Sequence, residues 1–545
     1  MSLYPIHITE IHRSFSSHRD MKCILLLELV SAAVSCFGDN ILVFLPTPTW
    51  SHYMQVQPIF HGLAIRGHNV TEVSSYRPQK KLPNHRHIYL SAEKWTNEIS
   101  ALWPEKNIIE DPLRRHHKIF RLTYPYDVIA THLITEVLES SVFHDLIRSK
   151  DNYDVIIAEP FFGAEAFVVL GQVFKAPVVA LSTFGYNSNI LRFAGAANAI
   201  AYLPYKDGIS VGPGPMGLLQ RLDNALTQTA ILFAFEYFYF PKFDSLLAKH
   251  IPGPLPRISE MLGDISLFLI TDNAALSGAK LYPPNAVEIS GMHFKEPEPL
   301  DEELTAVLDG SKHGAIFFSF GSAIKTSRFR KETIRLLLRV FQELDQTIIW
   351  TSDMNPTDWV VPKNVLIRPW FDQNSILAHP KCVLFVTHGG ISSAMEAVKY
   401  AVPMVAIPFF DDQIMTAASI EYYGYGLRVL YDHNFTDITL RWAVKTVLED
   451  PRFKENVKRG SKFLSDKPMS SLDTAIYWIE YVTRHKGAHH LKPLTVKMPW
   501  YQLLLLDIIV VYLVASIAIV ILVIALIKFF CKTARRWNLS KEKVN

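Results

Sequence analysis

The chain has 545 residues, of which 49% are hydrophobic and 20% are charged. This composition is typical of a folded protein, and the length exceeds what one hydrophobic core usually fills. Lysine and arginine number 55 against 52 aspartate and glutamate residues, and much of that small excess lies in residues 528–545. The body therefore lacks the basic field that nucleic-acid binding requires, and we expect two domains and no nucleic-acid partner.

Residues 1–38 are predicted to be an N-terminal extension and signal peptide. Met21 and Lys22 precede the apolar run CILLLELVSAAVSC, which has small residues near Ser35. A basic start, a short apolar run and small residues are the parts of a signal peptide. A buried strand is the alternative for the leucine run, but its terminal position favours the signal. Residues 1–20 resemble no signal, so either Met1 or Met21 can be the initiator.

Residues 39–292 alternate apolar strands with helical stretches. The strand ILVFL is followed by a helix that we expect from about His52, with Ser51 as its cap and Gly67 beyond its end. The runs DVIIAE and PVVALS repeat the pattern further on. Strands that alternate with helices predict a parallel sheet with helices on its faces.

Two features of the sequence do not indicate the function that their residue types suggest. The stretch 212–217 matches G-x-G-x-x-G, but two prolines would disrupt the turn and remove amides, so we expect no dinucleotide there. The histidine pairs at 116–117 and 489–490 have no companion ligands at metal spacing, and no Asp-x-Asp occurs. We expect no metal and no other cofactor.

Residues 293–500 begin with the linker HFKEPEPLDEEL and then start a second series of strands. The strands AIFFSF, TIIW, VLIRPW, LFVT and MVAIP follow, with a helix from about Thr333 to Leu344 after the first of them. This series predicts a second parallel sheet. Because ligands of such folds bind beyond the carboxyl ends of the strands, the loops after these runs are candidate sites.

The turn after LFVT has the residues of an anion site. His388, Gly389 and Gly390 precede a helix that we expect to begin near Ser392. Glycines let a ligand approach the backbone, and the first amides of a helix donate to anions. A histidine beside them can donate to the same phosphate, although a lone histidine is more often structural.

Groups suited to a base, a ribose and a sugar surround that turn. Trp370 offers a stacking face and Gln373 an amide for the edge of a base. Glu396 lies one helical turn beyond Ser392, where a carboxylate can accept from a ribose diol. Asp412 and Gln413 follow the next strand and can hydrogen-bond to sugar hydroxyls. Each residue is a weak signal alone; their order along the chain is a strong one.

The stretch WFDQNSILAHPKCVLFVTHGGISSAMEAVKYAVPMVAIPFFDDQ resembles the signature of the UDP-glycosyltransferases, the membrane-bound animal branch and above all its insect members. The resemblance continues through RGHNVT, FFSFGS, ISGMHF and WIEYVTRHKGAHHL, from about Asn40 to the tail. It implies an α/β fold of two Rossmann-like domains in a GT-B arrangement. The first would hold the acceptor, the second the UDP-sugar, and a final helix would cross back to the first.

The resemblance also implies a role for each matching residue. Trp370 should stack on uracil, Gln373 should bind the base or ribose, and Glu396 should hold the ribose. His388, Ser392 and Ser322 fall where the family contacts phosphates, and Asp412 and Gln413 where it holds the sugar.

In the first half, His52 stands where the family has its general base. A helix N-terminus disfavours an imidazolium, which would keep this ring neutral and able to accept a proton. Its carboxylate partner, an Asp in many relatives, is Glu159 in this chain. Without the resemblance, a lone histidine at this place would more often pack or cap.

Several residues depart from the usual pattern of the family. They are Thr351 for Lys or Arg, Asp372 for proline, Ala401 for glycine and Asp411 for a small residue. None removes a catalytic group, but together they bear on donor affinity and sugar preference.

The segment 508–527 has 20 residues without a charge, enough to span a bilayer. Trp500 and Tyr501 precede it, and the positive charges of the tail follow, which predicts a cytosolic tail at 528–545 and a luminal body. The terminal KEKVN resembles a dilysine retrieval signal through Lys541 and Lys543. These features predict a single-pass type I protein of the endoplasmic reticulum membrane.

Two further observations concern a luminal body. The sequons at Asn69 and Asn434 are N-glycosylation candidates, although Asn69 opens a predicted strand and burial would block its modification. Cys382 is the one cysteine certain to remain in the body, so no disulfide within a domain is expected.

We therefore expect an inverting hexosyltransferase that moves a sugar, in first place glucose, from a UDP-sugar to a hydroxyl of a small lipophilic acceptor, as in detoxification. Phe193, Phe233, Phe235 and Tyr237 suit a pocket for an apolar acceptor and suit a core equally well. UDP-glucuronate as the donor is one alternative, and a non-catalytic membrane-anchored lipophile-binding protein is another. The acceptor and the oligomeric state, including a homo-oligomer, stay open.

Overall fold

The structure is a computed structural model of the chain. It describes residues 38–78, 80–102, 118–185, 188–196, 199–205, 212–322, 324–410, 412–432 and 434–541. The predicted signal peptide, His116, His117, Asp411 and Lys543 lie outside these ranges.

The first half of the chain folds around a seven-stranded sheet whose order is β3-β2-β1-β4-β5-β6-β7. Every pairing in it is parallel. The strands are β1 (Asn40–Leu45), β2 (Asn69–Ser74), β3 (His85–Tyr89), β4 (Val155–Ala158), β5 (Val178–Ser182), β6 (Leu267–Ile270) and β7 (Ala286–Glu288). Their carboxyl ends therefore share one edge of the sheet, and β1, β4 and β5 are neighbours in its middle.

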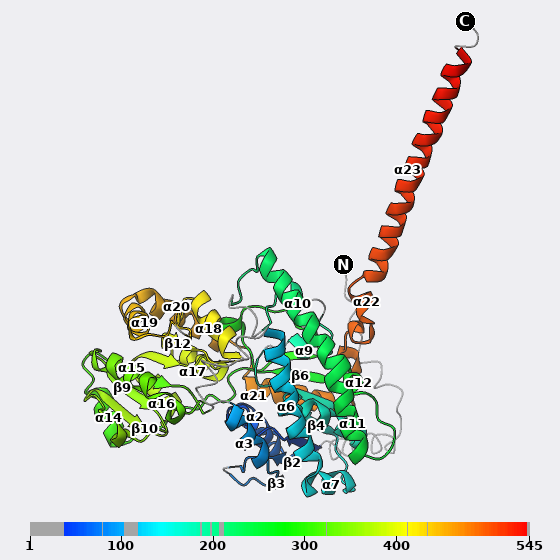
Figure 1. Cartoon of the computed structure of the whole chain (residues 1–545). Coiled ribbons are helices and arrows are strands. Elements are labelled where there is room, and N and C mark those ends of the chain that lie inside the picture. The colour runs from blue at the N-terminus through cyan, green and yellow to red at the C-terminus, as the bar shows by residue number, and fades with distance from the viewer. Residues whose placement is uncertain are drawn as a thin grey trace, which may run out of the picture.

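Helices cover both faces of this sheet (Figure 1). Apolar side chains of α2 (Trp50–Ile65) pack on one face, together with those of α21 (Ser471–Arg484) from the end of the chain. The remaining helices of this half are α3 (Glu93–Leu102), α6 (Lys118–Leu138), α7 (Ser141–Arg148), η2 (Ala164–Val169), α8 (Leu170–Phe174), α9 (Ser188–Phe193), η3 (Ala199–Ala201), α10 (Leu218–Ala234), η4 (Phe235–Tyr239), α11 (Phe240–His250), α12 (Ile258–Gly263) and α13 (Ala274–Ser277). Most of them bury residues in the core on the other face.

The second half folds around a six-stranded sheet of order β10-β9-β8-β11-β12-β13, again with parallel pairings. Its strands are β8 (Ala315–Ser319), β9 (Thr347–Thr351), β10 (Val365–Arg368), β11 (Cys382–Thr387), β12 (Met404–Ala406) and β13 (Gly426–Arg428). The prediction of two Rossmann-like parallel-sheet domains is thus confirmed.

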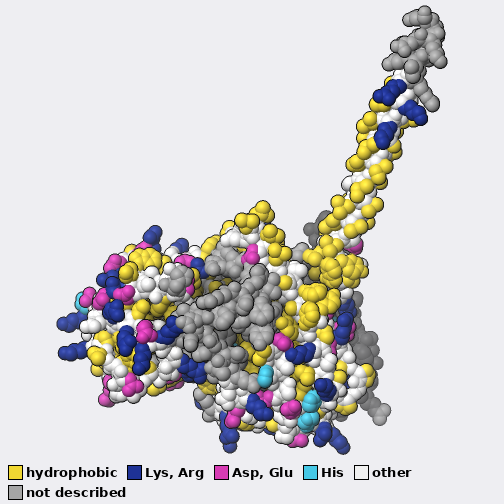
Figure 2. All heavy atoms as spheres, in the orientation of Figure 1, with side chains coloured by type: hydrophobic (Ala, Val, Ile, Leu, Met, Phe, Trp, Pro, Cys, Tyr) yellow, Lys and Arg dark blue, Asp and Glu magenta, His cyan; other side chains and the backbone are white. Residues whose placement is uncertain are grey.

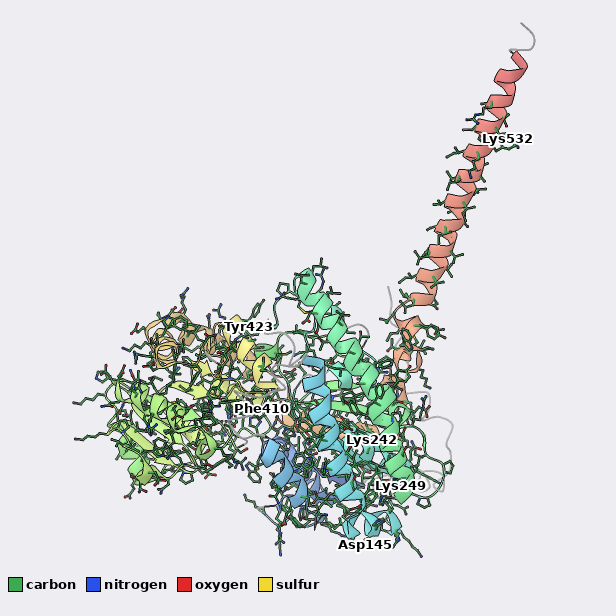
Figure 3. The ribbon with its side chains drawn as sticks, viewed as in Figure 1. Asp145, Lys242, Lys249, Phe410, Tyr423 and Lys532 are labelled. Atoms are coloured by element: carbon green, nitrogen blue, oxygen red, sulfur yellow. The ribbon has the colours of Figure 1, made fainter. Side chains whose placement is uncertain are left out.

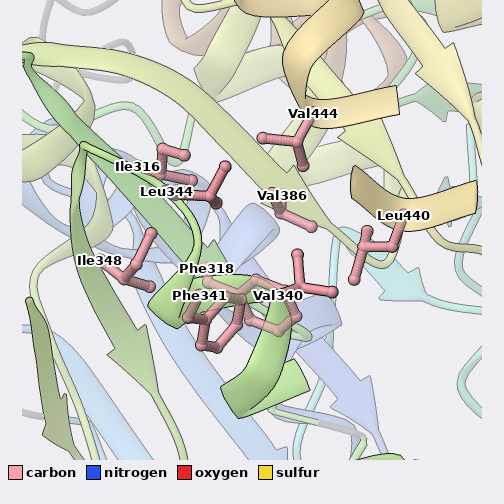
Figure 4. Close-up of a pocket in the computed structure, with 9 residues that line it drawn as sticks. All are labelled: Ile316, Phe318, Val340, Phe341, Leu344, Ile348, Val386, Leu440 and Val444. Atoms are coloured by element: carbon pink, nitrogen blue, oxygen red, sulfur yellow. The ribbon is translucent and has the colours of Figure 1, made fainter. Parts of the chain in front are cut away.

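The helices of the second half also form two layers. They are α14 (Glu302–Asp309), η5 (Thr326–Arg328), α15 (Lys331–Gln342), η6 (Pro356–Asp358), α16 (Gln373–Ala378), α17 (Ile391–Lys399), α18 (Asp412–Tyr422), α19 (Asp437–Glu449) and α20 (Pro451–Ser465). Figure 4 shows nine apolar side chains of α15, α19 and the strands beneath them. They leave no room for a water molecule, so this layer is packed core and no ligand site.

Helix α21 joins the end of the chain to the first sheet. Arg66 contacts Asp473 at 2.8 Å, and His68 contacts Glu480 at 3.3 Å. Beneath these polar contacts, Ile476 and Ile479 are buried in the same core as α2. The carboxylates of Asp39 and Glu480, which can accept hydrogen bonds from the His68 ring, raise the pKa of His68.

The membrane-proximal segment (residues 485–505) also lies against the first half. It contains η7 (His489–Leu491), η8 (Leu494–Lys497) and α22 (Trp500–Leu503). Lys492 Nζ lies 2.7 Å from Asp264 Oδ1, and Thr495 Oγ1 donates to the carbonyl of Gly195 at 2.5 Å.

Helix α23 (Leu506–Lys541) follows and projects from the body (Figure 1). Residues 506–535 of it have a mean hydropathy of 3.3 in their most apolar window and are long enough to cross a membrane.

Two local expectations are wrong. The helix expected from His52 with Ser51 as its cap begins earlier, at Trp50, with Thr49 in the N-cap position. Ser51 lies inside the first turn because the extended backbone of Thr49 already ends the preceding loop. Asn69 opens β2 but is exposed, so burial does not block its modification; its amide donates to Asn40 Oδ1 at 3.0 Å.

Candidate active site

Three polar side chains from the first half meet beyond the carboxyl ends of neighbouring strands. His52 follows β1 in the first turn of α2, Glu159 follows β4, and Thr183 follows β5. Because β1, β4 and β5 are adjacent in the sheet, residues far apart in the sequence are brought together. All three are buried.

His52 and Glu159 form a close pair. His52 Nδ1 lies 2.9 Å from Glu159 Oε1, with the ring turned so that no well-aligned hydrogen bond joins them. The same oxygen of Glu159 accepts a hydrogen bond from the hydroxyl of Thr183. Thr183 thus anchors the carboxylate that faces the imidazole. With Nδ1 beside Glu159, Nε2 is the nitrogen available to take a proton.

Aromatic rings enclose this pair on one side. The ring of Phe184 lies 4.0 Å from that of His52, edge to face. Phe161 packs on Phe184 with centroids 4.0 Å apart, and Phe162 packs on Phe161 at 4.1 Å. The histidine therefore borders an apolar wall. We refer to His52, Glu159, Thr183 and Phe184 as the first-domain site.

In the second half, His388 lies between two glycines at the end of β11. A Cβ on Gly390 would come within 2.5 Å of His388 Nε2, and one on Gly321 within 2.8 Å of Cε1. Only glycine leaves the ring this position. Burial lowers the pKa of His388 to about 4, so the ring is neutral at pH 7. Its Nδ1 has no hydrogen-bond partner.

Glu396 is held by the side chains of α16. Gln373 Nε2 donates to Glu396 Oε2, and Asn374 Nδ2 donates to Oε1 at 3.2 Å. His293, from the connection between the sheets, brings Nε2 to 3.5 Å from Oε1. Burial raises the pKa of Glu396 to about 7 against the opposing effect of these amides. The structure therefore brings Gln373 and Glu396 together, as expected for groups that share one ligand.

Asp412 and Gln413 make contacts with the backbone in this structure. Asp412 Oδ2 accepts from the amide of Ile391 at 3.2 Å, at the N-terminus of α17. Gln413 is buried, and its Oε1 accepts from the amide of Phe409 at 3.0 Å and from that of Phe410. Phe410 lies on the side of the second domain that faces the first (Figure 3). These contacts use one oxygen of each side chain, so they do not by themselves prevent contacts with a sugar.

The other expected donor-site residues lie around the same edge. Trp370 follows β10 and is 64% exposed, so its ring is accessible for stacking. Gly389, with a φ of 80°, makes the turn between β11 and α17. Ser322 is half-buried beyond β8, and Ser392 lies in the first turn of α17. We refer to Gln373, His388, Glu396, Asp412 and Gln413 as the second-domain site.

The two sites are joined by a direct contact. A Cβ on Gly185, the residue after Phe184, would come within 2.5 Å of Ile391 Cδ1. Ile391 opens α17, the helix of the second-domain site. Ser182 donates to the carbonyl of Gly185 at 2.7 Å and supports this turn. The loop beside His52 thus touches the helix that follows His388.

The departures from the family pattern have local explanations at two positions. The carboxylate of Asp372 accepts from Ser375 Oγ at 2.7 Å, beside the loop of Trp370. Ala401 has a φ of 54° after the end of α17, and the amides of Ala401 and Val402 bond back to Val398 and Ala397. This left-handed helix end is one that glycine adopts with less strain.

The aromatic residues considered for an acceptor pocket divide into two groups. Phe235 is buried, and Phe193 packs against the core of the first half. Phe233 and Tyr237 are 54% and 59% exposed on the outside of α10 and η4. For these two, neither the pocket nor the core interpretation holds.

Sequence reasoning missed four residues that support the site: Thr183, Phe184, His293 and Asn374. Thr183 and Phe184 directly follow the run PVVALS, so the end of that strand was the available signal. Within the described ranges, no three His, Cys, Asp or Glu side chains lie close enough to hold one metal ion. Whether the reaction needs a metal stays a prediction.

The family model and the relatives with similar sequences belong to one family of proteins. The family model described as "UDP-glucoronosyl and UDP-glucosyl transferase" matches residues 40–543. UDP-glucosyltransferase 2 of Dactylopius coccus is 34% identical over 95% of this chain and 98% of its own length. UDP-glucuronosyltransferase 2B18 of Macaca fascicularis is 28% identical over 95% and 98%.

Among solved structures, the calicheamicin glycosyltransferase CalG4 matches 82% of this chain and 99% of its own with a TM-score of 0.55. Its identity is 17%, so this likeness supports the GT-B fold alone.

Proposed function

The chain belongs to the UDP-glucuronosyl and UDP-glucosyl transferase family, and from this premise we propose that it transfers glucose from UDP-glucose, with inversion, to a hydroxyl of a small lipophilic acceptor. That the protein is a UDP-glycosyltransferase follows from the family model and the relatives that span its length. The donor sugar, the acceptor class and the cellular site are the proposed parts.

The observation that carries the proposal is the His52–Glu159 pair, with Nδ1 and Oε1 2.9 Å apart. The acceptor hydroxyl would give its proton to His52 Nε2, and its oxygen would attack the anomeric carbon as the bond to the phosphate oxygen of UDP breaks. Glu159, anchored by Thr183, would stabilise the imidazolium that forms. Phe184 and Phe161 offer the apolar surface that an aromatic or lipophilic acceptor requires.

The second-domain site would hold the donor. His388 and the first amides of α17 would stabilise the departing diphosphate, which would remove the need for a metal. Trp370 would stack on the uracil ring. Gln373 and Glu396, which already contact each other, would bind the base and the ribose diol. Asp412 would accept from sugar hydroxyls, and Gln413 would hydrogen-bond to them.

The charges near the sugar end favour a neutral hexose. Asp412 opens α18, the helix after β12, where the resemblance puts the sugar, and Asp411 precedes it in the sequence. A glucuronate carboxylate would meet their negative charge, whereas glucose hydroxyls can donate to it. The relative from Dactylopius coccus is a glucosyltransferase by name, which supports the same choice.

For the cellular setting, we propose that the signal peptide directs the body into the endoplasmic reticulum lumen. Helix α23 would then span the membrane, with Lys541 and Lys543 as a retrieval signal on the cytosolic side. Asn69 and Asn434 would be glycosylated there. A detoxifying role would suit this setting, because lipophilic compounds concentrate in membranes.

The test is acceptor-dependent UDP release by microsomes that carry the protein. UDP-glucose, UDP-glucuronate and UDP-N-acetylglucosamine would each be supplied with a pool of phenols and lipophilic alcohols. We expect release from UDP-glucose in excess over the other two, and none from the His52→Ala variant. Release from UDP-glucuronate alone would make the sugar assignment wrong. UDP binding without turnover of any donor would favour the non-catalytic alternative.

A further inference from the structure

Helix α10 buries three polar side chains and exposes four leucines, Leu218, Leu219, Leu222 and Leu226. Asn224, Thr227 and Gln228 are at most 3% exposed. In contrast, Leu219 is 78% exposed and Leu226 is 61% exposed. This is the reverse of the pattern that a helix on the surface of a water-soluble protein shows.

Specific hydrogen bonds hold the helix in this orientation. Asn224 Nδ2 donates to the carbonyls of Ile200 and Leu203 at 2.8 and 2.9 Å, and its Oδ1 accepts from the amide of Tyr205 at 2.8 Å. Gln228 Nε2 donates to the same Leu203 carbonyl at 3.0 Å. Rotation of the helix to bury its leucines would break these bonds and leave buried backbone groups without partners.

The outward side chains form one continuous face, which we call the α10 apolar face. Its members are Leu218, Leu219, Leu222, Leu226, Phe233 and Tyr237. From Leu219 onward they recur every three, four or seven residues, as one side of a helix requires. A helix of this length extends about 25 Å. The charged residues of α10, Arg221 and Asp223, lie to either side of the face.

The position of this face indicates what covers it. The first turns of α10 lie on the side of the body from which α23 projects (Figure 1). On that side, hydrophobic atoms are exposed at the end of α10 and at the start of α23 (Figure 2). On the same side, Trp500 is 62% and Tyr501 is 43% exposed. Thr495 and Lys492 fasten the membrane-proximal segment to Gly195 and Asp264 of the first half. The first domain is therefore held beside the point where α23 begins.

We propose that the first half of the α10 apolar face, from Leu218 to Leu226, is a second membrane contact that inserts into the interfacial layer of the bilayer spanned by α23. Leucines provide the apolar area for this contact, and the lack of charge on the face avoids the penalty of burying ions. The proposed anchoring of α23 is its premise, and the test separates the two. Such a contact holds the apolar wall beside His52 near the lipid bilayer, in which lipophilic acceptors dissolve.

The test places an environment-sensitive fluorophore, NBD, at single cysteines of the full chain in phosphatidylcholine vesicles. Cys23, Cys36 and the exposed Cys531 are first replaced by serine, while Cys382 is buried and stays. Three labelled variants are compared: Leu222→Cys on the α10 apolar face, Ile519→Cys within α23, and Asp145→Cys as the control. Asp145 is exposed on α7, on the side of the body away from α23 (Figure 3).

We expect a doxyl-bearing lipid to remove more than half of the emission at Leu222 and Ile519 and little of that at Asp145. Aqueous iodide should show the reverse order. Quenching of the Leu222 label by iodide alone, with Ile519 still quenched by lipid, would overturn the membrane contact and leave the anchor intact. Protection of that label from both quenchers would also overturn it, because a second copy or another protein would then cover the face.

Failure of the Ile519 label to respond to lipid would overturn both the anchor and the contact. Retained UDP-sugar turnover shows that each variant is folded. If Leu222→Cys does not fold, Leu226→Cys occupies the same face and takes its place.

Discussion

The first-domain site and the second-domain site differ in how ready they are for a reaction. In the first, Thr183 donates to Glu159, His52 Nδ1 lies 2.9 Å from the same carboxylate oxygen, and Phe184 packs on the imidazole. In the second, Gln413 accepts from two backbone amides, and Gln373 and Asn374 donate to Glu396. The difference teaches that the proposed base already lies beside its carboxylate, whereas the proposed donor-binding groups are engaged by partners within the protein. Changes in the first should therefore lower kcat, and changes in the second should raise KM for the donor.

The largest effect is expected from His52→Ala. Loss of the general base should lower kcat by about 1,000-fold while UDP binding stays unchanged, because no group of the second-domain site is altered. Transfer rates and UDP affinity by calorimetry measure the two parts. His61→Ala, on the same helix but outside the site, is the matched control and should retain activity. A His52→Ala enzyme with near-normal kcat would remove the first-domain site from the reaction.

Next in size is Glu159→Gln, which keeps the shape but removes the charge that faces His52. We expect kcat to fall by about 100-fold, since the imidazolium formed in the transition state loses its counterion. KM for the donor should not change. Glu159→Asp, which restores the charge on a shorter side chain, should recover part of kcat. Near-normal kcat in the Gln variant, together with a low kcat in the Asp variant, would mean that side-chain length, not charge, is what His52 needs.

In the second-domain site, Gly390→Ala should displace His388, because the new Cβ would lie within 2.5 Å of Nε2. Strain of about 1–3 kcal/mol is typical of such overpacking, and we expect KM for the donor to rise about tenfold with little change in kcat. Gly217→Ala is the control, since its nearest neighbour would be 3.5 Å away. A fall in kcat with unchanged KM would contradict the division of roles between the sites.

A smaller effect should appear in the pH dependence of donor binding. The pKa of Glu396 is raised to about 7 by burial, so the carboxylate is ionised above this pH and protonated below it. The ionised carboxylate can accept a hydrogen bond from each hydroxyl of a ribose diol. In the protonated form one oxygen carries a hydrogen and acts as a donor. KM for the donor should thus rise as the pH falls below about 7, by at most about tenfold per pH unit. In Glu396→Gln this slope should vanish; a slope that persists would assign the titration to another group.

The smallest effect concerns stability alone. Ala401→Gly should relieve the left-handed backbone at the end of α17, where φ is 54°. The expected gain is about 0.5–1 kcal/mol, or roughly 2 °C in the midpoint of thermal inactivation. Ala397→Gly, inside the same helix, should lower the midpoint by a similar amount. Neither should alter kcat, and a change in kcat would mean that α17 transmits strain to His388.

Much of the fold could be predicted because strand and helix periodicities are local properties. Runs such as ILVFL and AIFFSF are too short and too apolar for exposed helices, and their alternation with helical stretches leaves a parallel sheet as the arrangement that buries them. The start of α2 was wrong by two residues, since Thr49 and Ser51 are both acceptable caps and only the path of the preceding loop decides between them.

The candidate site was harder to predict from the sequence, because it depends on the order of the strands in the sheet. Nothing in the sequence places β1 beside β4, so the distance between His52 and Glu159 could not be known before the sheet order was. The contacts of Gln413 with the amides of Phe409 and Phe410 were missed because backbone demands leave no sequence signal. The exposure of Phe233 and Tyr237 was missed because an aromatic residue on a helix has the same sequence pattern whether its face is buried or exposed.

The attachment of the membrane-proximal segment has a mechanical consequence. Lys492 and Thr495 contact Asp264 and Gly195, and α21 packs against α2. The chain that leads into α23 is therefore attached to the first domain. If α23 spans a membrane as proposed, the first domain is the one fastened beside the anchor. Any movement of the proposed donor-binding domain would then take place relative to a first domain that is fixed at the membrane.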